Sequence, residues 1–190
     1  MTLLATYLPD YSFREVHSCT IAASTDTVIS AAADYTPEAD PIFRTMIGLR
    51  EVPMRLAGFL KGTQAQLPQS FGMHNFELLE RRDGSELAYG LVGRFWRFDF
   101  GLVPIVDGSA FLRFDAPGVA KLALGFSAER QENGTTRLVT ETRIFCPDRA
   151  TWLKFAPYWY LIYPASALIR RRVLAAIKKS SEAPFQSANL

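Results

Sequence analysis

The chain has 190 residues, a length that is typical of one domain and sufficient to enclose a hydrophobic core. Apolar residues make up 48% of it and charged residues 21%, which excludes a disordered or fibrous chain. Lys and Arg total 21 against 19 Asp and Glu, and this net charge of +2 is too balanced to indicate a protein that binds nucleic acid by neutralising phosphates.

The two cysteines and the hydropathy of the chain indicate the compartment in which the protein is expected. Cys19 and Cys146 are too few and too far apart for a disulfide framework or a zinc site, and they favour a reducing cytoplasm. The longest uncharged run, residues 155–169, contains two prolines and is shorter than the ~20 residues that span a bilayer. We expect a cytoplasmic protein with a single domain over residues 1–179 and a flexible tail over residues 180–190.

The first third of the chain predicts a strand followed by helices. Residues 13–23 are rich in β-branched and aromatic side chains and contain no breaker, which indicates a strand. Ser24 is a suitable N-cap for a short helix. Asp26 lies in the first turn of that helix, where a negative charge complements the helix dipole. A second helical stretch is predicted over residues 41–60, with a break at Pro53.

The middle of the chain predicts an antiparallel meander. Asp83-Gly84 joins strands over residues 74–81 and 86–94, and Asn133-Gly134 joins strands over 120–130 and 135–146, because both dipeptides favour tight hairpin turns. Pro117-Gly118 suggests a further hairpin between residues 110–115 and 120–130. Between them, residues 95–109 predict a short strand and a long loop, which either covers a cavity mouth or is anchored by buried aromatic residues.

A long helix is predicted after the meander. Asp148 is a good N-cap, and Pro157 and Pro164 should bend the helix. Its apolar face recurs every three or four residues at Trp152, Phe155, Trp159, Ile162, Ser166, Ile169, Val173 and Ala176.

This order of elements resembles the START/Bet v 1-like (SRPBCC) superfamily over residues 13–179. The local similarities are the strand-to-helix entry at residues 21–28 and the closing strand at residues 140–143, which precedes an aromatic helix. The resemblance implies an α+β helix-grip fold, in which a curved antiparallel sheet wraps around a long C-terminal helix and two short helices follow the first strand. It also implies a hydrophobic cavity between the sheet and that helix.

The alternation of side chains along each strand predicts which residues face the cavity. The predicted inner residues are Leu87, Tyr89 and Leu91, then Leu112 and Phe114, then Leu122, Leu124 and Phe126, and then Leu138, Thr140, Thr142 and Ile144. The opposite faces should form a solvated surface with cross-strand ion pairs. Glu141 and Arg143, which are two residues apart on one strand and so share a face, should form a surface ion pair there. That assignment would reverse if Val139 and Phe145 faced the cavity.

The favoured function is the binding of a hydrophobic or amphipathic small molecule. Thr140, Thr142 and Tyr89 would orient the polar part of the ligand, although they could equally bond one another or a buried water. The residues predicted to bind the ligand are Tyr89, Leu91, Phe114, Leu124, Phe126, Leu138, Thr140, Thr142, Trp152, Phe155 and Trp159.

The first alternative is an enzyme of the polyketide cyclase or aromatase kind that uses the same cavity. His74 and Tyr89 would then be its weak acid–base candidates, but a lone histidine is more often structural. His17 is assigned no role. The sequence contains no nucleophile motif, metal-ligand cluster or cofactor fingerprint, so we predict neither a cofactor nor a metal and leave catalysis open.

The second alternative is an accessory protein that acts at a membrane or protein surface through the C-terminal helix. Tyr158, Tyr160, Leu161 and Tyr163 are flanked by Lys154 and by the basic residues 170–172, as in segments that lie at a membrane interface. A homodimer contact or a solvated basic end is the favoured interpretation of this pattern, and no nucleic-acid partner is expected.

Overall fold

A computed structural model describes residues 1–35, 72–97 and 99–186, with side chains to residue 183. One antiparallel sheet with the strand order β1-β5-β4-β3-β2 forms its centre, which makes the fold α+β as predicted. The strands are β1 Phe13–Ile21, β2 Glu77–Arg82, β3 Glu86–Gly93, β4 Ala120–Arg130 and β5 Thr136–Phe145.

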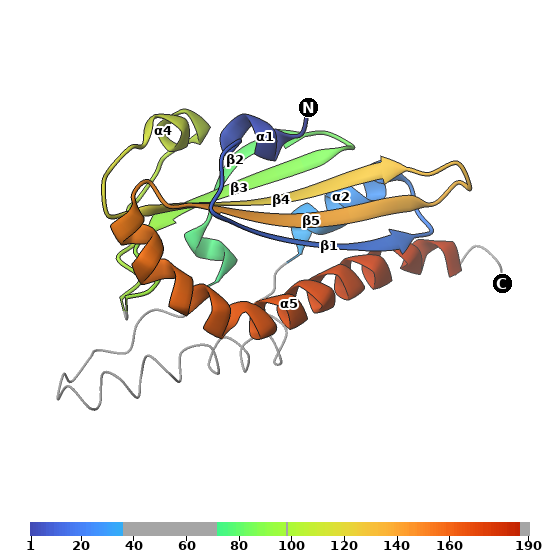
Figure 1. Ribbon diagram of the computed structural model, residues 1–190. Helices are drawn as coiled ribbons and strands as arrows, with labels where there is room; N and C mark the ends of the chain where they lie inside the picture. The colour runs from blue at the N-terminus through green and yellow to red at the C-terminus, as the bar shows by residue number, and fades with distance from the viewer. Residues whose placement is uncertain (36–71, 98, 187–190) are drawn as a thin grey trace.

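Helices cover both faces of this curved sheet (Figure 1). The inner face lies against α2 and the long helix α5, and the outer face lies against α1 and α4. This arrangement is compatible with a helix-grip fold. The helices are α1 Leu3–Tyr7, α2 Thr25–Asp34, the 3-10 helix η2 Met73–Asn75, α4 Gly108–Arg113 and α5 Arg149–Gln186.

The two hairpins with Asp-Gly and Asn-Gly turns are confirmed. Gly84 and Gly134 have φ angles of 68° and 81°, values that glycine adopts without the strain another residue would suffer. The first helix is also confirmed, because the Ser24 hydroxyl caps α2 by accepting a hydrogen bond from the Thr27 N–H at 3.2 Å. The second predicted helix, over residues 41–60, lies outside the described residues.

Asp148 starts α5 and also ties it to the outer layer. Its carboxylate accepts hydrogen bonds from the Thr151 N–H at 2.7 Å and from the Gly118 N–H at 3.0 Å, and these bonds lower its pKa. The bend predicted from the two prolines is visible in α5 (Figure 1).

The C-terminal end of α5 corrects one expectation. The helix runs to Gln186, although we expected a flexible tail from residue 180. Ser181 is 1% exposed, and Glu182 accepts a hydrogen bond from the Ala22 N–H at 2.8 Å. These contacts hold the end of the helix beside the end of β1.

The strand predicted over residues 110–115 is wrong, because residues 110–113 belong to α4 and Phe114 is its C-cap. Asp107 caps the helix by accepting a hydrogen bond from the Ala110 N–H at 2.6 Å. Phe111 is fully buried, whereas Leu112 is 48% exposed. Pro117-Gly118 therefore forms a turn between a helix and a strand, with Gly118 at a φ of 74°.

The outer face is partly covered, although we expected it to be solvated. Leu4 of α1 and Phe111 of α4 pack on it, and two strand glycines make room for them. A Cβ atom at Gly125 would lie 2.7 Å from Leu4, and one at Gly90 would lie 2.7 Å from Phe111. The fold therefore has one core on each side of the sheet.

Candidate functional site

A cluster of polar side chains lies on the inner face of the sheet, where β1 and β5 meet α5. Glu15 is paired with Thr142 across the two strands, and His17 is paired with Thr140. Side chains of paired residues lie on the same face of a sheet, so these four are neighbours. Ser166 reaches the cluster from α5 through its hydrogen bond to Glu15.

The carboxylate of Glu15 organises this cluster. The side chain is buried, at 3% exposed, although a carboxylate is costly to remove from water. Its Oε1 lies 2.8 Å from Nε2 of His17, and its Oε2 accepts a hydrogen bond of 2.8 Å from the Ser166 hydroxyl. Both carboxylate oxygens therefore have partners, and the histidine ring is held against a fixed acceptor.

Thr140 and Thr142 stand beside this bonded group with unused hydroxyls. They are 1% and 4% exposed, and neither Oγ1 has a hydrogen-bond partner among the residues that the structure describes. By contrast, the Thr136 hydroxyl on the same strand and face donates to the Ala23 carbonyl at 2.6 Å. Burying a hydroxyl without a partner costs roughly 1–3 kcal/mol, so the two threonines are suited to receive a polar group.

The surroundings of the two hydroxyls are apolar. Leu124 and Phe126 of β4 are the cross-strand partners of Thr142 and Thr140. Tyr89 of β3 lies beyond Leu124, and burial raises the pKa of its phenol, so this group stays neutral. An apolar surface with a few polar atoms is typical of sites for small amphipathic molecules.

Most of the predicted ligand-binding side chains belong to this inner face. Trp152 is the exception on α5, because it is 40% exposed while stacking on Phe13 with ring centroids 5.8 Å apart. The role of all the predicted residues in ligand binding stays a prediction. The inner set comprises Tyr89, Leu91, Leu124, Phe126, Leu138, Thr140 and Thr142 from the sheet, and Phe155 and Trp159 from α5.

The placement of Phe114 on the inner face is wrong. It caps the C-terminus of α4 and packs against the outer core, because its segment is helical. The weak catalytic candidate His74 lies exposed in η2 and is not part of the polar cluster. The loop after β3 is anchored by Phe95 and Phe100, which are 1% and 3% exposed. This agrees with the interpretation of the segment as a loop held by buried aromatic residues.

Glu141 and Arg143 lie on the outer face, as the favoured interpretation predicted. One carboxylate oxygen of Glu141 accepts hydrogen bonds from Nε of Arg143 and Nε of Arg14, both at 2.7 Å. Arg143 also donates to the carbonyls of Leu4 and Leu8. Burial opposes ionisation of Glu141, but the two arginines outweigh it and lower its pKa.

We expect Glu141→Gln to weaken the fold at neutral pH and to flatten its response to acid. The lowered pKa means that this carboxylate stabilises the fold fully above its ordinary pKa of 4.5 and loses that effect as the pH falls through the lowered value. The loss should be about 1 kcal/mol at pH 7 and should vanish in strong acid. Urea unfolding across this range measures it. Asp83→Asn is the control, because its side chain is 90% exposed, and an equal effect there would contradict the prediction.

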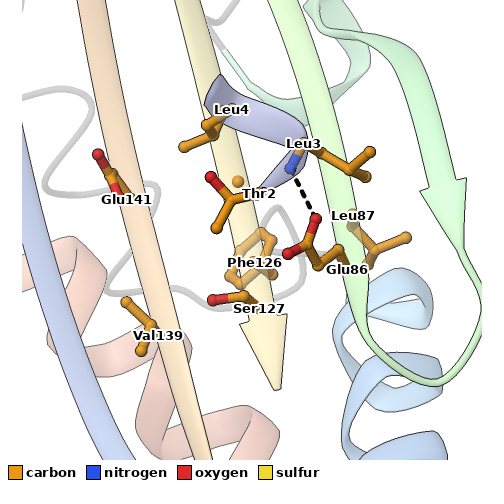
Figure 2. A pocket seen from close by; sticks show the side chains of 10 residues that line it. Thr2, Leu3, Leu4, Glu86, Leu87, Phe126, Ser127, Val139 and Glu141 are labelled. Carbon is orange, nitrogen blue, oxygen red and sulfur yellow. Dashed lines mark hydrogen bonds between the residues drawn. The ribbon is translucent and has the colours of Figure 1, made fainter. Parts of the chain in front are cut away.

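Described residues line a cavity and a groove on the outer side of the sheet. Figure 2 shows the first, a cavity of about 20 Å³ beside α1, where the Leu3 N–H donates to Glu86 at 2.6 Å. It has room for one water molecule. The second is an open groove of about 290 Å³ between the segment after α1 and Leu112 of α4. Lys121 lines it and donates to the Leu112 and Phe114 carbonyls, and burial lowers its pKa.

Neither metal binding nor thiol chemistry is indicated in the described part of the chain. No group of three His, Cys, Asp or Glu side chains lies close enough there to hold a metal ion. Burial raises the pKa of the Cys146 thiol to about 11, and it also raises that of Cys19. Both thiols are therefore protonated and weakly nucleophilic at neutral pH.

Glu15, His17 and Ser166 were not predicted from the sequence to belong to the site. A signal was present in the first strand, because Phe13, Glu15, His17, Cys19 and Ile21 alternate and so share one face. The buried ends of that series, Phe13 and Ile21, place the intervening carboxylate inside. Ser166 occupied the apolar face of the long helix, where a lone hydroxyl gave no indication of its partner.

Comparisons with known proteins do not identify the chain. No family model matches it, and no curated protein matches it. Among solved structures, it is similar to a hypothetical protein of Helicobacter pylori, at 10% identity and a TM-score of 0.40, over 93% of this chain and 92% of the other. That similarity adds nothing to the argument about function.

Proposed function

We propose that the protein binds a hydrophobic or amphipathic small molecule between the inner face of the sheet and α5. The observation that carries the proposal is the pair of buried hydroxyls at Thr140 and Thr142, which have no hydrogen-bond partner in the described part of the chain. A hydroxyl, carbonyl or carboxyl group on the ligand would complete their hydrogen bonds, and its apolar part would contact Leu124 and Phe126.

The architecture supports the same proposal. A curved sheet against a long C-terminal helix is the arrangement expected of the START/Bet v 1-like (SRPBCC) superfamily, whose members include lipid-transfer domains and polyketide cyclases. Phe155 and Trp159 of α5 add aromatic surface on the same side of the sheet, where they pack with Phe13 and Ile144. We assign the chain to this superfamily as part of the proposal.

A second candidate is an enzyme that uses the same site, with His17 in place of His74. Glu15 holds Nε2 of His17 at 2.8 Å, which is the geometry of a histidine oriented for proton transfer. Such an enzyme would convert its bound molecule. A mass change of the ligand with wild-type protein, absent with His17→Gln, would favour this candidate over binding alone.

Thr140→Val with Thr142→Val tests the proposal. We expect native mass spectrometry of fresh wild-type protein, or of protein incubated with lauric acid, cholesterol or 1-naphthol, to show a one-to-one adduct. The double variant should lose the adduct or bind it at least about fivefold more weakly, since each hydrogen bond contributes roughly 0.5–1.5 kcal/mol. Its unliganded form should be as stable as the wild type or more so, because two unpaired hydroxyls are gone.

Thr136→Val is the matched control. It removes a hydroxyl from the same strand and the same face, but this hydroxyl is bonded to the Ala23 carbonyl. The control should lower stability by about 1–3 kcal/mol and keep the adduct. No adduct with any of the three probes, or equal binding by the double variant, would overturn the proposal.

A further inference from the structure

Helix α5 presents an apolar surface to solvent in its first half. Leu153, Tyr160, Leu161 and Leu168 are 55%, 68%, 57% and 48% exposed. Leucines normally bury most of their surface, and a row of exposed ones marks an interaction site. The spacing of three and four residues puts them on one side of the helix, together with two exposed prolines. We call this set the apolar stripe: Leu153, Pro157, Tyr160, Leu161, Pro164 and Leu168.

Positive charge is concentrated on the same helix. Over Arg149–Gln186 there are seven Lys and Arg residues and one acidic residue, Glu182. The helix therefore carries +6, whereas the whole chain carries +2. Lys154 is exposed beside the stripe, and Arg171 is exposed on the same side, one turn beyond Leu168.

We propose that this side of α5 docks on the surface of an anionic lipid bilayer, with the helix in the plane of the membrane. The stripe would enter the boundary between headgroups and acyl chains, and the basic side chains would contact lipid phosphates. Tyr160 and Tyr163, which are 68% and 42% exposed, are side chains that favour this boundary. None of the described helices is long and apolar enough to cross a membrane.

Charge favours lipid over a second copy of the chain. A twofold contact through this side would bring two helices of charge +6 together, and like charges in contact are repulsive. The stripe has no acidic residue to pair with the cations of a partner copy. An anionic bilayer offers both negative charge and an apolar layer, so it matches both features of α5.

Vesicle co-sedimentation of the full chain tests the proposal. We expect binding to vesicles of phosphatidylcholine with phosphatidylglycerol, and little or none to phosphatidylcholine alone. Raising the salt from about 0.05 M to about 0.5 M should weaken binding strongly, because the Debye length then falls well below 10 Å. Failure to bind the anionic vesicles at low salt would overturn it.

Two sets of exposed substitutions locate the contact. Leu153→Glu with Leu161→Glu, and separately Lys154→Gln with Arg171→Gln, should each reduce binding at least about tenfold. Val106→Glu and Arg137→Gln are controls, because they alter an exposed apolar and an exposed basic residue outside α5. All four variants should keep the wild-type melting temperature.

Three results would count against the lipid. One is equal binding by the α5 variants and the wild type, and another is an equal loss in the controls. The third is a wild-type dimer in light scattering that Leu161→Glu converts to a monomer, without any vesicle binding, since a second copy would then cover the stripe. None of these outcomes depends on the small-molecule site, whose test uses Thr140 and Thr142.

Discussion

Phe155→Ala should lower the free energy of unfolding by roughly 3–5 kcal/mol, the usual cost of removing a buried aromatic ring. Phe155 is 1% exposed, and its ring lies 5.1 Å from that of Phe13 and 6.3 Å from that of Phe95, measured between centroids. It therefore joins α5 to β1 and to the loop after β3. The melting temperature should fall by about 10 °C, given ~2–4 °C per kcal/mol in a chain of this size.

Urea unfolding measures this loss, and Leu153→Ala on the same helix is its control. Leu153 is 55% exposed, so its truncation should change stability by less than ~0.5 kcal/mol. If the ligand lies between the sheet and α5, Phe155→Ala should also weaken the lauric acid, cholesterol or 1-naphthol adduct. A loss of stability below about 1 kcal/mol would mean that α5 is not held to the sheet by this ring.

Phe111→Ala should cost a similar roughly 3–5 kcal/mol, but from the opposite face of the sheet. Phe111 is fully buried, packs edge-to-face on Tyr7 at 6.5 Å, and has Nζ of Lys121 at 4.7 Å from its ring centroid. Removal of the ring leaves a void that the strand below cannot fill, because Gly90 has no side chain there. Urea unfolding again measures the loss in free energy of unfolding, and Leu112→Ala, at the exposed neighbouring residue, is the control.

The comparison of the two phenylalanine variants separates stability from binding. Both should be destabilised by similar amounts, but Phe111→Ala should retain the small-molecule adduct, because α1 and α4 cover only the outer face. If both variants lost the adduct to the same degree, the loss would not distinguish the inner face of the sheet from the outer face. That result would contradict a site confined to the inner face.

Much of the fold could be predicted, because local chemistry determined it. The positive φ angles at Gly84 and Gly134 fix two hairpins, and the caps Ser24 and Asp148 start two helices. The segment over residues 110–115 was misread because six residues fit a period of two as well as one of 3.6. Asp107, a good N-cap, was the signal that should have decided for a helix.

The candidate site could be predicted only in part. Alternation placed Tyr89, Thr140 and Thr142 inside, because each strand holds its parity over its whole length. It could not show that the two threonine hydroxyls lack partners, since that depends on which groups α5 brings to the sheet. The bond between Glu15 and Ser166 joins residues 151 positions apart, and no local pattern encodes such a contact.

The strand order also determines when the chain can finish folding. The neighbour of β1 in the sheet is β5, so Phe13 pairs with Ile144, and α5 must then pack across both. During synthesis, β1 emerges before the other described strands, and its partner β5 follows only after more than a hundred further residues. Contacts of such long sequence separation form slowly, because the loop that they close is long. The sheet can therefore be completed only after β5 has been synthesised, and until then the edge of β1 that β5 will cover is open to pairing with other chains.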